Sequence, residues 1–103
     1  MITHIVIFWI DKPYLENREK FLAEAKKLSQ ISDVLEYRCG IPVPSTRGAV
    51  DDSFAVGISM TFPSQEVADH YQKDPIHLEF LEKGFKPYVK RFVVYDWSVV
   101  DKK

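Results

Sequence analysis

The sequence predicts an α+β fold in which two helical segments cover one face of a four-stranded antiparallel sheet. Four segments have the apolar pattern of strands, and two have the 3.6-residue period of amphipathic helices. Their order is strand, helix, strand, strand, helix, strand, which is the split βαβ order of ferredoxin-like folds. Since 103 residues is close to the commonest domain size, we expect a single domain over residues 1–103.

The first strand is expected over residues 2–10, and both of its faces are apolar. One face carries Ile2, His4, Val6, Phe8 and Ile10, and the other carries Ile5, Ile7 and Trp9. A strand with two apolar faces must be covered on both sides. Residues 15–29 then predict a helix whose apolar residues recur at helical spacing and whose charged residues face solvent.

Two further strands are expected over residues 34–43 and 54–62. Pro42 and Pro44 cannot pair inside a sheet, so the earlier strand lies at an edge or ends there. The later strand has the clearest alternation, with one bulky face and one face of small residues. Two different surfaces must therefore pack against it.

The second helical segment is interrupted. Ser64 is a candidate cap at its start, and Pro75 breaks it because proline has no N–H and disfavours helical dihedrals in the residue before it. Gly84 occupies the position expected of a helix-terminating glycine, followed by Pro87. The last strand is expected over residues 88–100, apolar on both faces and close to the first strand.

The helices can cover only one face of this sheet, yet its first and last strands are apolar on both. So much exposed apolar surface is unusual for a monomer. The simplest cover is a second copy of the same sheet. We therefore expect a C2 homodimer in which two sheets pair into a barrel-like core.

Composition excludes several partners. The formal net charge of −1 and the scattered basic residues give no electrostatic case for nucleic acid or an anionic membrane surface. The single Cys39 rules out an intramolecular disulfide and a multi-cysteine zinc site. No segment has a membrane-spanning length of apolar residues and no signal peptide is recognised, so a cytoplasmic protein is expected.

The segment most suggestive of function runs from Tyr71 to Phe80. The break at Pro75 places Tyr71 and His77 on opposite sides of a kink, and histidine can exchange a proton near neutral pH. One interpretation is that both residues face a cavity. The other is that His77 is a half-buried, hydrogen-bonded histidine and Tyr71 a core residue.

Three motifs resemble the stress-responsive A/B barrel (Dabb, dimeric α/β-barrel) family. They are Ile2-x-His4-Ile5-Val6-x-Phe8, the D-P-x-H-x-x-F segment from Asp74 to Phe80, and Val93-Val94-x-Asp96. The resemblance covers essentially the whole chain and implies ferredoxin-like chains that pair their sheets in a dimer. A histidine common in the family just before the proline is Asp74 here.

The resemblance also extends, more distantly, to olivetolic acid cyclase, a family member that condenses a linear polyketide without a metal or cofactor. It implies that His77 acts as a general base, that Tyr71 donates a hydrogen bond to the developing oxyanion, and that His4 orients the substrate or His77. The implied substrate pocket is lined by Val6, Phe8, Phe21, Ile58, Met60 and Phe80. Those apolar side chains could equally fill the space as a core.

Three functions therefore stay open from the sequence. The first is a dimeric domain that binds an apolar or aromatic small molecule, with no reaction assigned. The second is a cofactor-independent, polyketide-cyclase-like lyase that uses His77. The third is a structural stress-response protein without catalysis. An open cavity reaching His77 favours the first two, and a filled core favours the third.

Overall fold

A computed structural model of the chain describes residues 1–100, so the last three residues of the expected domain lie outside the described part. The strands are β1 (Ile2–Ile10), β2 (Glu36–Gly40), β3 (Val56–Phe62) and β4 (Val89–Ser98). They form one antiparallel sheet in the order β2-β3-β1-β4. The prediction of a ferredoxin-like fold with adjacent first and last strands is confirmed.

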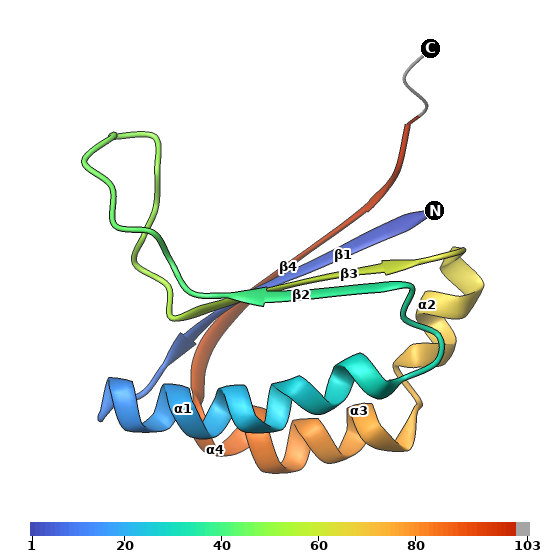
Figure 1. Cartoon of the computed structure of the whole chain (residues 1–103), viewed down its shortest axis with the longest axis horizontal. Helices are drawn as coiled ribbons and strands as arrows, with labels where there is room; N and C mark the ends of the chain where they lie inside the picture. The colour runs from blue at the N-terminus through green and yellow to red at the C-terminus, as the bar shows by residue number, and fades with distance from the viewer. Residues whose placement is uncertain (101–103) are drawn as a thin grey trace.

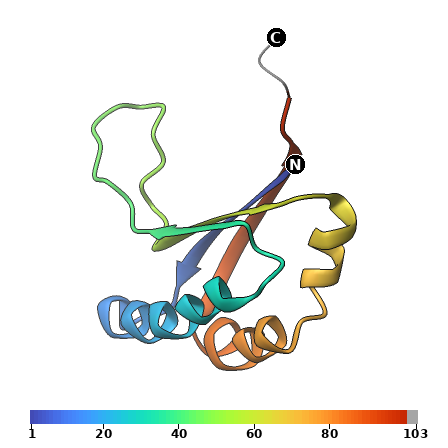
Figure 2. The same ribbon diagram turned by 45° about the vertical axis from the view of Figure 1, so that its right-hand side comes forward.

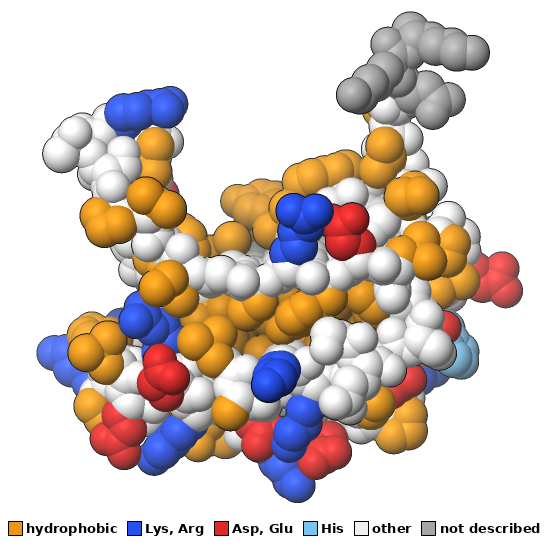
Figure 3. Space-filling view, viewed as in Figure 1, with side chains coloured by type: hydrophobic (Ala, Val, Ile, Leu, Met, Phe, Trp, Pro, Cys, Tyr) orange, Lys and Arg blue, Asp and Glu red, His pale blue; other side chains and the backbone are white. Residues whose placement is uncertain are grey.

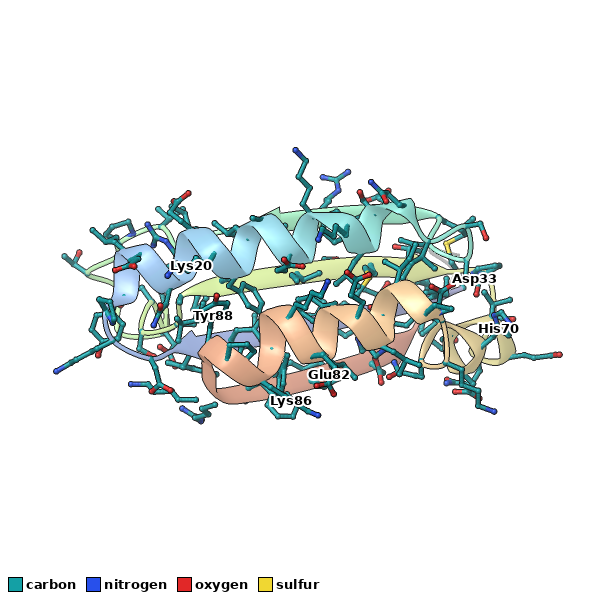
Figure 4. The ribbon with its side chains drawn as sticks, turned by 90° about the horizontal axis from the view of Figure 1, so that it is seen from below. Lys20, Asp33, His70, Glu82, Lys86 and Tyr88 are labelled. Atoms are coloured by element: carbon teal, nitrogen blue, oxygen red, sulfur yellow. The ribbon has the colours of Figure 1, made fainter. Side chains whose placement is uncertain are left out.

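The helical layer lies on one face of the sheet (Figure 1). It comprises α1 (Tyr14–Ala25), the 3₁₀ segment η1 (Lys26–Gln30), α2 (Gln65–Tyr71), α3 (Pro75–Phe80), the π-helical turn η2 (Leu81–Phe85) and α4 (Lys86–Tyr88). Seen from below, α1 and the continuous α3–η2–α4 helix run side by side across the sheet (Figure 4). Figure 3 shows charged side chains over this layer and apolar ones between it and the sheet.

The core lies between the helices and the bulky face of the two central strands. Because side chains alternate along a strand, every second residue of β1 and β3 points to the helices. The buried members are Val6, Phe8, Ile10, Val56, Ile58, Met60 and Phe62. The intervening residues point to the opposite side, which we call the outer face, so the alternation seen in the sequence separates two surfaces as expected.

The outer face has no helix over it (Figure 2). It carries Ile5, Ile7 and Trp9 from β1, the small residues Gly57, Ser59 and Thr61 from β3, and Val93, Tyr95 and Trp97 from β4. The side chains of Tyr95 and Trp97 are 56% and 49% exposed. The loop of residues 41–55 rises on the same side, and the Trp9 indole N–H donates to the Ser53 hydroxyl at its base, 3.1 Å away.

Three of the strands are shorter than the sequence predicts, including β4, which was expected over residues 88–100 and spans Val89–Ser98. β2 ends at Gly40, before Pro42, because proline cannot donate to a strand ladder. β3 begins at Val56 rather than at residue 54. The cap and the break are as expected: the Ser64 hydroxyl accepts from the Val67 N–H, and α3 begins at Pro75.

The prediction that Gly84 and Pro87 end the helix is wrong. The helix continues through both residues to Tyr88, and Gly84 has no positive φ. Gly84 instead allows two helices to approach closely. A Cβ atom there would lie 2.9 Å from the Glu24 Cβ of α1 and 3.1 Å from the Phe80 ring, closer than atoms pack without displacement.

None of the helices within residues 1–100 has both the length and the apolar character needed to cross a membrane. The cytoplasmic location expected from the sequence stays a prediction.

Candidate functional site

A cavity of about 240 Å³ lies between the helix-covered face of the sheet and the α3–η2 helix. We call it the His77 cavity. Its lining is mostly apolar and consists of His4, Val6, Phe8, Leu28, Ile58, Met60, Tyr71, Gln72, His77, Phe80, Leu81, Phe85, Phe92 and Val94. Phe92 and Val94 are 50% and 42% exposed, so the cavity reaches solvent beside β4. The core is therefore not filled at this point.

The break between α2 and α3 directs Tyr71 and His77 toward this cavity. Tyr71 is the last residue of α2, and the Asp74 carboxylate caps α3 by accepting from the Ile76 N–H at 2.8 Å. Pro75 occupies the first turn of α3, where a missing N–H costs nothing. The Tyr71 and His77 ring centroids are consequently only 4.6 Å apart.

His77 is buried and held in one orientation by the backbone. Its Nδ1 lies 3.2 Å from the Gln72 carbonyl oxygen, which only accepts, so the Nδ1–H tautomer makes this hydrogen bond. Nε2 then carries the free lone pair. Burial lowers the pKa of His77, although the Gln72 hydrogen bond acts in the opposite direction. His77 is therefore a neutral imidazole with a basic nitrogen at neutral pH.

Tyr71 supplies a neutral hydroxyl next to this imidazole. Its side chain is 1% exposed, and burial, with the charge of Asp74, raises its pKa. Its ring packs against Phe62, with the centroids 4.9 Å apart. Within residues 1–100 the hydroxyl makes no hydrogen bond, so its proton is available to a molecule in the cavity.

His4 completes the polar side of the cavity and is oriented by Asp96. The register of β1 and β4 places these residues opposite each other, and the His4 Nδ1 lies 2.5 Å from the Asp96 carboxylate. Because a carboxylate accepts, Nδ1 carries the proton and Nε2 is left to other partners. The His4 ring lies 6.2 Å from the Tyr71 ring, centroid to centroid.

Eight of the nine residues proposed from the sequence line the cavity: His4, Val6, Phe8, Ile58, Met60, Tyr71, His77 and Phe80. The exception is Phe21, and its assignment to the pocket is corrected here. Its ring is fully buried against Phe8 and Phe80, at centroid distances of 4.8 and 5.6 Å, on the α1 side of the core.

Sequence reasoning missed the residues at the mouth of the cavity and the partner of His4. Phe92, Val94 and Asp96 alternate along β4, so they share a face, and this pattern was visible in the sequence. The pairing register of β1 and β4, which places Asp96 opposite His4, could not be derived from the sequence. Residues 1–100 contain no group of three or more histidine, cysteine or acidic side chains arranged to hold a metal ion.

These features define the class of the protein as a ferredoxin-like α+β domain with an apolar cavity between sheet and helices. The sequence profile of the stress responsive A/B barrel domain (Dabb) matches residues 2–99, and the chain therefore belongs to this family, as its motifs indicated. No curated protein sequence matches the chain significantly.

Solved structures share the whole fold. A Dabb family protein from Mesorhizobium loti is 26% identical, with 97% of each chain covered and a TM-score of 0.77. A hydroxynitrile lyase from Passiflora edulis is 20% identical, with 99% of this chain and 94% of that chain covered and a TM-score of 0.80. A dimeric ferredoxin-like protein of unknown function from Thermobifida fusca is 17% identical, with coverages of 95% and 90% and a TM-score of 0.75.

Proposed function

We propose that the protein is a homodimer in which each subunit binds a small, largely apolar molecule in the His77 cavity. The observation that carries this proposal is the convergence of His4, Tyr71 and His77 on one cavity with otherwise apolar walls. A few directed polar groups in an apolar cavity are typical of small-molecule sites. The ligand that fits has an apolar or aromatic body, a group that donates to a histidine Nε2 and a carbonyl that accepts from the Tyr71 hydroxyl.

The dimer is supported by the outer face. Its apolar side chains on β1 and β4 flank a strip of small residues on β3, which leaves room for a second sheet to pack closely. Three structural neighbours are described as dimeric ferredoxin-like proteins. We expect the pairing to bury roughly 2,000 Å² or more, as obligate dimers do.

Blocking the mouth of the cavity tests the binding site. Val94→Trp places a bulky ring at the mouth, and it is expected to weaken binding of an aromatic β-keto ester such as ethyl benzoylacetate by about tenfold or more, or ~1.4 kcal/mol. Val99→Trp is the matched control, because Val99 is similarly exposed, at 49%, but does not line the cavity. Calorimetry on both variants measures the difference, and equal loss of binding in both would contradict the site.

A second candidate function is favoured by the state of His77. A neutral imidazole with a free Nε2, next to a neutral phenol, is suited to removing a proton from carbon. The corresponding reaction is a cofactor-independent aldol-type condensation, as in polyketide cyclisation. A hydroxynitrile lyase among the structural neighbours supports lyase chemistry on this fold.

The proposed steps use only groups that line the cavity. His77 Nε2 takes a proton from a carbon between two carbonyls, and Tyr71 donates a hydrogen bond to the enolate oxygen that forms. The enolate carbon then attacks a second carbonyl carbon of the same molecule. The proton held by His77 passes to the new alkoxide, so the imidazole is regenerated. His4, whose ring is oriented by Asp96, orients the substrate.

A further inference from the structure

A second cavity of about 240 Å³ lies at the opposite end of β1 from His4. It is formed by the start of α1, the end of β1, the start of β4 and the end of the 41–55 loop. Its lining is Trp9, Ile10, Tyr14, Arg18, Ser53, Phe54, Ala55 and Lys90, and we call it the Arg18 cavity. It shares no residue with the His77 cavity, so neither proposed function accounts for it.

Two cations, and no acidic side chain, line the Arg18 cavity. In the part of the chain that the structure describes, no carboxylate lies within 4.0 Å of the Arg18 guanidinium or the Lys90 ammonium. The basic residues nearby on the helical layer behave differently. Lys20 pairs with Glu16 and Lys86 with Glu82, and Figure 4 shows Lys20, Glu82 and Lys86 on the helices. Arg18 and Lys90 thus bring two positive charges without a carboxylate partner to the lining of this cavity.

The Arg18 side chain also carries a donor without an acceptor. Its Nε is buried and makes no hydrogen bond to any group within residues 1–100. Buried polar groups in native proteins are nearly always paired, so an acceptor is expected at this position. The guanidinium is planar and offers parallel N–H groups, which match the two oxygens of a carboxylate or a phosphate.

Other groups around the Arg18 cavity complement an anion with an apolar body. The Lys90 ammonium lies 5.5 Å from the centre of the Tyr14 ring, so a cation–π contact keeps it at the cavity. The Ser53 hydroxyl accepts from Trp9, at 3.1 Å, and can donate its own proton elsewhere. Ile10, Phe54 and Ala55 provide the apolar wall.

We propose that the Arg18 cavity is a binding site for a small organic anion, distinct from the His77 cavity. The carboxylate or phosphate group pairs with Arg18 and Lys90, and an aromatic or aliphatic body packs against Phe54 and Ala55, at the edge of the Trp9 ring. The site selects its ligand by negative charge, in contrast to the His77 cavity, whose lining contains no cation from lysine or arginine.

Fluorescence of Trp9 tests this site directly. The chain has two tryptophans, so Trp97→Phe leaves Trp9 as the single reporter at the cavity. In this background, benzoate and phenyl phosphate are expected to change the emission saturably, whereas the neutral isostere benzamide is not. A response to both anions defines an anion site in general, and a response to one alone assigns carboxylate or phosphate as the group recognised.

Variants assign the effect to residues. Arg18→Gln and Lys90→Gln are each expected to raise the anion Kd about tenfold, because each removes a charge-assisted contact. Lys20→Gln, on the same helix but away from the cavity, is the matched control and is expected to leave the Kd unchanged. Circular dichroism confirms that each variant is folded.

Two results would overturn the anion site. One is an equal response to benzamide, which would reduce the cavity to an apolar surface. The other is a dimer that dissociates more readily after Arg18→Gln with no change in anion binding, which would mean that the cation is neutralised by the second subunit. If no ligand binds in the His77 cavity, the Trp9 emission still reports on the Arg18 cavity, because Trp9 does not line the His77 cavity.

Discussion

Replacement of Val93 by aspartate is expected to convert the protein from a dimer to a monomer. Val93 lies in the middle of β4, on the outer face and directly opposite Ile7 of β1. If this face packs against a second sheet, the substitution buries an unpaired carboxylate at the interface, which costs about 3–5 kcal/mol. That cost corresponds to a rise of roughly 10²–10⁴-fold in the dimer dissociation constant. Light scattering at micromolar concentration measures the change.

Leu15→Asp is the control for this experiment. Leu15 is also a large apolar residue and is 69% exposed, but it lies on α1, on the side of the molecule opposite the outer face. Its replacement is expected to leave the mass at twice the chain mass of 12.0 kDa. A wild-type protein with the mass of one chain at micromolar concentration would show that the apolar outer face has another role.

Replacement of His77 by glutamine is expected to have the largest effect on chemistry. The probe is the exchange of the CH₂ protons of ethyl benzoylacetate with D₂O, because this carbon lies between two carbonyls as the proposed reaction requires. Glutamine keeps a donor for the Gln72 carbonyl but has no basic nitrogen. The protein-dependent exchange rate, measured by NMR, should therefore fall about 10²–10⁴-fold, the usual contribution of general-base catalysis.

The pH dependence gives a second signature of His77. Burial lowers its pKa below the ordinary histidine value of 6.5, so the imidazole stays neutral, and active, as the pH falls through 6.5. The exchange rate per protein should then decrease only at lower pH, as His77 becomes protonated. A decrease centred above pH 6.5 is inconsistent with His77 as the base.

His70→Gln provides the matched control for the exchange experiment. The imidazole of His70 is 72% exposed and binds Asp33, with its Nδ1 2.7 Å from the carboxylate, at the end of the molecule labelled in Figure 4. It does not line the His77 cavity, so its replacement should leave exchange unchanged. If both histidine variants lower the rate equally, the exchange is not catalysed at the cavity.

Local patterns in the sequence determined much of the fold. The two-residue alternation along β3 assigned its bulky face to the core, and the proline at residue 75 separated two helices, because both effects depend only on nearby residues. The same proline placed Tyr71 and His77 on either side of a helix break. The uncovered apolar face of the sheet could also be predicted, because two helical segments can cover only one of the two faces.

Features that depend on tertiary contacts were not accessible in this way. Gly84 resembled a terminating glycine, but its role is set by the approach of α1, which no local pattern encodes. Asp96 became a partner of His4 only through the pairing of β1 with β4. Phe21 was placed in the pocket because apolar type does not distinguish a core residue from a cavity wall.

The most direct test of the small-molecule site is an NMR titration of the three histidine side chains with ethyl benzoylacetate. His4 and His77 line the cavity, whereas His70 is exposed outside it, so the protein contains its own control. Binding in the His77 cavity predicts saturable shifts of the His77 and His4 ring resonances with one common Kd, and no shift of His70. Unchanged resonances of His77 at saturating ligand, or equal shifts of all three histidines, would contradict the proposed site.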